Sequence, residues 1–105
     1  MTVPVLTAEQ RRAALDKAAR VRRERAEVKN RLKHSAASFT DVLRTGNTDE
    51  VIAKMKVVEL LQAMPGMGKV RARATMQRLQ ISESRRVRGL GVNQVAALER
   101  EFEQR

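Results

Sequence analysis

The chain has 105 residues, which is enough for one domain. Its 22 Lys and Arg against 12 Asp and Glu give a net charge of +10, and this charge predicts a polyanionic partner. It has no cysteine, and His34 is its only histidine, which excludes a disulfide framework and a Cys or His metal site, so we expect no cofactor. Apolar runs of only a few residues exclude a membrane span and a signal peptide, and they predict a soluble, cytoplasmic protein with no membrane partner.

A short tail of residues 1–6 precedes a long predicted helix. Thr7, with Gln10 three residues later, has the spacing of a capping box, and no proline or glycine follows before about Ala36. The apolar stripe is thin before Val21, so the first turns should project from the domain. Residues 11–33 carry ten Lys and Arg against three acids, which favours a DNA-contacting arm over a solvated helix stabilised by propensity alone. The residues expected to contact DNA here are Arg22, Lys29 and Lys33.

Two short helices are predicted after residue 35. Ser38 can cap a helix from Phe39 to Arg44 that Gly46 ends. Asn47, with Glu50 three residues later, has the spacing of a second capping box. The helix that it starts would carry Val51, Ile52 and Met55 and would help to close the core.

Two further helices, over residues 57–64 and 69–79, are predicted from apolar residues at helical spacing. Pro65 ends the first, and Gly66 and Gly68 then allow the backbone to turn with positive φ. We expect the chain to form a tight hairpin between the two helices, with one face of the second helix packed on the core and its other faces charged.

The start of the second of these helices has the properties of a phosphate-binding site. The first N–H groups of a helix lack intrahelical partners and lie at the positive end of the macrodipole, and glycines let a nucleic-acid strand approach closely. The alternative is a tight turn with a solvated basic face. The residues that we expect to bind DNA here are Gly66, Met67, Gly68, Lys69, Val70, Arg71 and Arg73.

An arginine cluster follows twelve residues after Arg73. We expect Val87 and Leu90 to point inward and to anchor the cluster, in which no acid occurs between Ser84 and Glu99. Charge runs are commonly solvated faces, but an anchored group of like charges favours binding of an external anion. The predicted ligands are Ser84, Arg85, Arg86 and Arg88, and the three arginines are candidates for insertion into a narrowed minor groove.

The last predicted helix runs from Val92 to about Glu103, with Val92, Val95, Ala96 and Phe102 on its inward side. Period-two alternation never persists, so the predicted fold is all-α. Residues 1–37 would form the tail and the long basic amino-terminal helix, and residues 38–105 a compact helical domain. Phe39 and Phe102 are the only aromatic residues and both fit a core, which favours a duplex over single strands that stack on aromatic rings.

The segments PGMGKVRA, ISESRRVRGLG and GVNQVAALEREF resemble the helix-two-turn-helix module, which occurs in a small-subunit ribosomal protein and in some DNA glycosylases. Within that group the chain is most similar to the actinobacterial integration host factors, and EQRRAALDKAARVRRERAEVKNRLKHS and KMKVVELL share the likeness. It extends from Thr7 to Phe102, and it implies that residues 38–105 are a compact helix-two-turn-helix domain that binds DNA. The resemblance implies a nucleoid-associated protein that binds double-stranded DNA with little sequence preference and bends or compacts it.

Two other functions compete with this one. No nucleophile has a visible partner and no paired carboxylates lie in a glycine-rich setting, so we expect neither an enzyme nor a small-molecule substrate. The second alternative is a protein that binds structured RNA or the ribosome with the same module. The related ribosomal protein continues into a long basic tail, whereas this chain ends in EREFEQR, which favours DNA. We expect the protein to be monomeric when free in solution.

Overall fold

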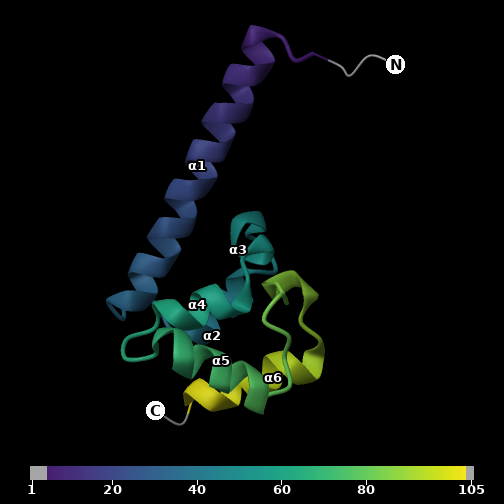
Figure 1. The fold of residues 1–105 in the computed structure, drawn as a ribbon. Helices are drawn as coiled ribbons and strands as arrows, with labels where there is room; N and C mark the ends of the chain where they lie inside the picture. Colours follow the sequence, from purple (N-terminus) through teal and green to yellow (C-terminus); the bar gives the residue numbers. More distant parts are fainter. Residues whose placement is uncertain (1–4, 104–105) are drawn as a thin grey trace.

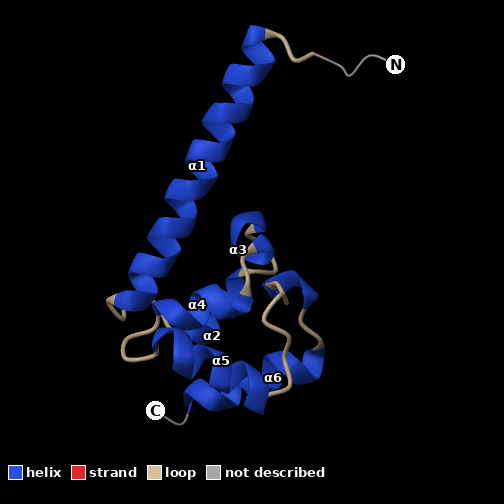
Figure 2. Cartoon of the chain, in the orientation of Figure 1, coloured by secondary structure: helices blue, strands red, loops and turns tan. Residues whose placement is uncertain are grey.

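The computed structural model describes residues 5–103. Its elements are α1 (Ala8–Lys33), α2 (Phe39–Thr45), α3 (Glu50–Lys54), α4 (Val57–Ala63), α5 (Gly68–Arg78), a 3-10 turn η1 (Val87–Gly89) and α6 (Val92–Glu103). Figures 1 and 2 show a long helix leaving a body of shorter helices, with no strand in the described part. The prediction of an all-α fold is confirmed. A single antiparallel bridge, between Lys56 and Arg86, is the one sheet-like contact within residues 5–103.

Helix α1 begins at the predicted capping box. The Thr7 hydroxyl accepts a hydrogen bond from the Gln10 N–H at 3.0 Å, and Gln10 Oε1 accepts one from the Thr7 N–H at the same distance. Residues 8–18 are exposed, as expected for turns that project, whereas Val28 and Leu32 are buried. The second half of α1 therefore belongs to the core, and a domain boundary at residue 37 stays a prediction.

Helix α1 ends earlier than the expected Ala36, at Lys33. Ser35 adopts φ of 57°, and the N–H groups of Ser35 and Ala36 donate to the carbonyls of Leu32 and Arg31, at 3.2 and 2.8 Å. These two bonds form a Schellman motif, which satisfies carbonyls at the helix end. The motif uses serine where glycine is usual, so sequence patterns do not indicate it.

The short helices α2 and α3 differ in how well their caps were predicted. Ser38 caps α2 by accepting a hydrogen bond from the Asp41 N–H at 3.1 Å, as expected. The prediction of a capping box at Asn47 is wrong. Helix α3 is capped by Asp49, whose Oδ1 accepts a hydrogen bond from the N–H of Val51 at 2.9 Å. Since α3 starts only at Glu50, Asn47 lies in the preceding loop.

Buried apolar side chains from all six α-helices form one core. Phe39 of α2 contacts Phe102 of α6 with ring centroids 4.7 Å apart, which confirms that both aromatic residues are structural. The buried apolar residues among residues 5–103 are Val28, Leu32, Phe39, Val42, Leu43, Ile52, Met55, Val57, Leu60, Leu61, Met67, Ala72, Met76, Ile81, Val87 and Leu98.

The inward face predicted for α6 is wrong at two positions. Val92 is 87% exposed and Ala96 is also exposed, whereas Leu98 is fully buried. At 100° per residue Val92 lies about 120° around the helix from Leu98, so both cannot face the core. Leu98 sets the rotation of α6, and Phe102, one turn later, packs partly buried on the same side.

None of the helices in the described part combines the length and the apolar character that a membrane crossing requires.

Candidate nucleic-acid interface

The hairpin between α4 and α5 turns on its two glycines, as predicted. Gly66 and Gly68 have φ of 74° and 67°. Met67 is buried and its backbone N–H donates to the Met64 carbonyl at 3.1 Å, so Met67 anchors the turn from inside and does not face a ligand itself. A Cβ at either glycine would meet nothing within 4 Å among the described residues, which shows that the outer side of the hairpin is open to a ligand.

Helix α5 starts directly in this hairpin, and no side chain of the described residues caps it. The N–H groups of its first turn are therefore left for a ligand or for water. Lys69, Val70 and Arg71 are exposed around this helix start, and Val70 is 81% exposed despite being apolar. Arg71 folds back and its Nη1 donates to the Gly66 carbonyl at 3.0 Å, which holds its charge over the hairpin.

Arg73 lies apart from this group. Its Nε forms an ion pair with Glu83 at 2.9 Å, and both side chains are largely exposed. The pair joins α5 to the loop that follows it. Among the cations predicted at the hairpin, Arg73 thus has its charge neutralised by an acid.

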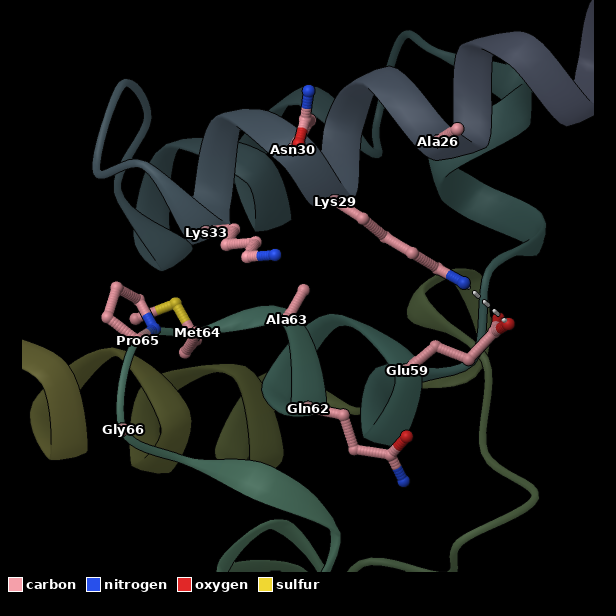
Figure 3. Close-up of a pocket in the computed structure, with 10 residues that line it drawn as sticks. All are labelled: Ala26, Lys29, Asn30, Lys33, Glu59, Gln62, Ala63, Met64, Pro65 and Gly66. Carbon is pink, nitrogen blue, oxygen red and sulfur yellow. Dashed lines mark hydrogen bonds and ion pairs between the residues drawn. The ribbon is translucent and has the colours of Figure 1, made fainter.

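A basic cleft lies between α1 and the α4 end of the hairpin, and Figure 3 shows its walls. Lys29 reaches across it from α1 to an ion pair with Glu59 of α4 at 3.4 Å, while Lys33 extends over Ala63. The cleft has a volume of about 540 Å³. The residues that line it are Ala26, Lys29, Asn30, Lys33, Glu59, Gln62, Ala63, Met64, Pro65 and Gly66.

This cleft brings together parts of the interface that are far apart in the sequence. Lys33 and Gly66 line the same space, so the basic face of α1 continues into the glycine hairpin. Arg22 is exposed further along α1, seven residues before Lys29 and therefore on the same helix face. The structure thus aligns Arg22, Lys29 and Lys33 with one side of the hairpin.

The second predicted site, which we name the arginine loop (residues 82–89), is clamped to the body by its backbone. The Val57 N–H donates to the Arg85 carbonyl and the Val87 N–H donates to the Met55 carbonyl, each at 3.0 Å. Val87 is buried and Leu90 is half-buried, which confirms that both point inward. The clamp fixes the loop against the junction of α3 and α4.

The three arginines of the arginine loop are exposed and differ in their contacts. Arg85 Nη1 donates to the Gly89 carbonyl at 3.0 Å and Arg86 Nη1 donates to the Lys54 carbonyl at 2.7 Å. Arg88 makes no side-chain hydrogen bond within residues 5–103. A shallow depression of about 340 Å³, which we name the arginine cup, is lined by Ser82, Ser84, Arg85, Arg86, Arg88 and Gly89.

Electrostatics agree with a position of α3 between the arginine loop and α1. The pKa of Glu50 is lowered from its usual value chiefly by a hydrogen bond and charge from Lys54, with smaller contributions from Lys17 of α1 and from Arg88.

Figure 1 shows the hairpin and the arginine loop at opposite ends of the body. The predicted site residues therefore form two basic surfaces rather than one.

Sequence patterns missed several basic residues of α1 and of the segment beside the arginine loop. Lys56 is exposed and pairs with Arg86 in the antiparallel bridge, and the Lys54 carbonyl accepts from that arginine. Arg25, on the inner side of α1, has a buried Nε without a hydrogen-bond partner among the described residues. The sequence shows the basic residues Lys54 and Lys56, but it does not indicate that this segment pairs with Arg86, thirty residues after Lys56.

Comparisons with known proteins agree with this geometry. Residues 32–102 match the family described as S13-like H2TH domain. The chain is 67% identical to the integration host factor of Streptomyces coelicolor, over 97% of this chain and 95% of that protein. It is 52% identical to the integration host factors of Mycolicibacterium smegmatis, over 99% of both chains, and of Mycobacterium tuberculosis, over 97% of both.

A solved structure described as "Structure of sIHF bound to an 8bp palindromic DNA" is similar to this one with a TM-score of 0.81. The two chains are 67% identical, and the similarity covers 83% of this chain and 98% of the other.

Proposed function

The chain belongs to the integration host factor family of S13-like H2TH proteins, and from this membership we propose that it is a nucleoid-associated protein that binds double-stranded DNA. It is an architectural protein rather than an enzyme. It binds with little sequence preference, and it bends and compacts the duplex through contacts with the phosphate backbone and the minor groove. It acts in the cytoplasm, at the nucleoid, and is monomeric when free.

The observation that carries the proposal is the cleft shared by Lys33 of α1 and Gly66 of the hairpin. A DNA backbone that follows this cleft meets Lys33 on one side and Gly66 on the other, two residues before the uncapped start of α5. These groups recognise phosphate, which every sequence offers equally. Low sequence preference follows because the interface consists mainly of cations and backbone N–H groups.

The arginine loop supplies the second contact. Arg85, Arg86 and Arg88 stand on a clamped backbone, and cations of this kind favour the strong negative potential of a narrowed minor groove. The hairpin and the arginine loop lie at opposite ends of the body, so a straight duplex contacts both only if they share a plane, and the basic face of α1 extends the surface further. A bend of about 40 to 90° costs on the order of 1 to 6 kcal/mol, which added phosphate contacts offset.

The proposal also assigns different roles to the two parts of the chain. Residues 38–105 carry the hairpin and the arginine loop and form the DNA-binding domain, and residues 1–37 form the tail and the long basic helix, whose second half also packs into the core through Val28 and Leu32. The exposed residues 8–18 extend the basic surface of this helix beyond the body. Binding of structured RNA or of the ribosome is not favoured, since the similar structure is described as bound to DNA.

Salt-dependent binding to duplexes of unrelated sequence tests the proposal. Log affinity should fall with log salt with a slope of about 0.9 per phosphate neutralised, and the duplexes should differ little in affinity. A slope near zero, or strong preference for one sequence, would overturn it.

Charge-reversal variants then test the two surfaces separately. Arg22→Glu and Arg88→Glu, on α1 and the arginine loop, should each weaken binding to every duplex. Arg100→Glu is the matched control, since it makes the same charge change on an exposed position of α6. Equal weakening by all three variants would show that net charge, rather than these surfaces, determines affinity.

Ring closure of short duplexes tests bending. The full chain should accelerate closure, and Arg88→Glu should reduce the acceleration even at protein concentrations that restore binding. Equal closure rates with and without the protein would remove bending from the proposal.

A further inference from the structure

The arginine cup contains two serine hydroxyls beside its cations. Ser82 and Ser84 are both exposed, and their Oγ atoms lie 2.9 Å apart. Both line the same depression as Arg85, Arg86 and Arg88. Any group attached to either hydroxyl would therefore start in a depression that three arginine side chains also line.

The two serines have different structural tasks. The Ser82 hydroxyl accepts the Ser84 N–H at 3.3 Å, and the Ser82 carbonyl accepts the Arg85 N–H at 3.0 Å, so Ser82 shapes the turn. Within residues 5–103 the Ser84 hydroxyl forms a hydrogen bond only with the Ser82 hydroxyl. Ser84 can thus be modified while the bonds that hold the loop stay in place.

None of the described residues that line the arginine cup carries a carboxylate. Glu83, the acid between the two serines, turns away and pairs with Arg73 at 2.9 Å. Glu83 therefore does not neutralise the arginines of the cup, and these arginines remain available to an anion from outside the loop.

We propose that Ser84 is a phosphorylation site and that its phosphate is captured by the arginine cup, which closes this surface to DNA. The inference rests on the proposed DNA-binding function and adds regulation to it. In the step, an ATP-dependent serine kinase joins Ser84 Oγ to the γ-phosphorus while the bond from that phosphorus to the β,γ-bridging oxygen breaks. The hydroxyl proton passes to a base of the kinase, and ADP leaves.

The phosphoserine competes with DNA on favourable terms. It carries a charge of about −1.5 to −2 and three acceptor oxygens, which match guanidinium donors as a DNA phosphate does. Because it is tethered within the same loop, its effective concentration at the cup is of millimolar order. DNA must displace the phosphoserine before a DNA phosphate can contact the arginines of the cup.

Phosphorus NMR of the free protein tests the capture without DNA. With phosphoserine incorporated at position 84, the second pKa of the phosphate should fall at least about one unit below its usual value near 6. The control carries phosphoserine in place of Thr48, which is exposed and precedes Asp49 and Glu50, so its pKa should not fall. Arg88→Gln should raise the pKa at position 84 again. An unshifted pKa at position 84 would overturn the inference.

Duplex binding at fixed salt completes the test. Phosphoserine at position 84 should weaken binding at least about tenfold and reduce the salt slope by about 0.9 for each DNA phosphate that the cup no longer neutralises, and the position 48 control should weaken it less. Failure of the unmodified chain to bind would instead refute the proposed function. A shifted pKa with unchanged affinity would overturn the regulatory role, as would equal weakening at positions 84 and 48.

Discussion

Gly46→Ala should loosen the arginine loop from the far side of the core. Gly46 ends α2 with a right-handed φ of −58°, so alanine is acceptable to the backbone. The methyl group of an alanine at this position, however, has no space. A Cβ there would lie 2.6 Å from Cγ1 of Val87 and 3.1 Å from the Leu43 carbonyl oxygen. Because Val87 is the buried anchor of the arginine loop, the clash falls on the segment that positions the arginines.

The size of the effect follows from two opposing terms. Overpacking of a core typically costs about 1–3 kcal/mol, and replacing glycine stabilises by about 0.4–1 kcal/mol through the unfolded chain. Val87 has little freedom to move, since its N–H is bonded to Met55 and its carbonyl accepts from Leu90. We therefore expect a net loss of about 1–2 kcal/mol, which lowers Tm by roughly 4–15 °C in a domain of this size.

Thermal unfolding followed by circular dichroism measures this loss, and Gly91→Ala serves as the control. A Cβ at Gly91 would have Gln94 Oε1 as its nearest neighbour, at an ordinary 3.8 Å, so Tm should hardly change. Val87→Ala removes the clashing methyl groups, and the Gly46→Ala/Val87→Ala pair should be less destabilised than the sum of the single variants. Strict additivity, or a wild-type Tm for Gly46→Ala, would refute the steric argument.

Three further predictions concern single elements. Gly66→Ala and Gly68→Ala meet no steric obstacle among the described residues, so each should cost only the strain of a positive φ, about 1–2 kcal/mol, and replacement by asparagine should cost less in the same unfolding assay. Leu98→Ala should cost about 2–5 kcal/mol and Val92→Ala less than about 0.5 kcal/mol; the reverse order would mean that α6 is rotated differently. Thr7→Ala should accelerate hydrogen exchange in the first turn of α1 and leave Tm unchanged, because residues 8–18 are exposed.

Features of the fold that depend on neighbouring residues were predictable from the sequence. The capping box at Thr7, the cap at Ser38 and the glycine hairpin each need only a few consecutive residues, and all three are confirmed. The end of α1 was harder, whereas α5 ends at Arg78, one residue before the predicted Leu79. Ser35 and Gln80 both take positive φ in Schellman motifs, where sequence patterns lead one to expect glycine or asparagine.

Features that depend on distant residues were not predictable. The rotation of α6 is set by how Leu98 and Phe102 meet the other helices, and periodicity alone allowed Val92 to face inward. The bridge between Lys56 and Arg86 joins segments thirty residues apart. At the candidate site, charge and spacing selected the basic segments, but only the three-dimensional contacts distinguish which guanidinium groups are paired and with what.

That distinction orders the arginines by their expected contribution to DNA binding. Arg71, Arg85 and Arg86 each donate to a backbone carbonyl, which is neutral, so they keep their full charge while losing side-chain freedom before DNA arrives. An arginine side chain carries about 2 kcal/mol of rotamer entropy, and prior ordering lowers the cost of binding. Arg73 is ordered by Glu83, whose charge cancels its own. Arg73→Gln should therefore change the salt slope less than Arg85→Gln, and Glu83→Gln should strengthen duplex binding by releasing Arg73. A larger fall in slope for Arg73→Gln than for Arg85→Gln would contradict this ordering.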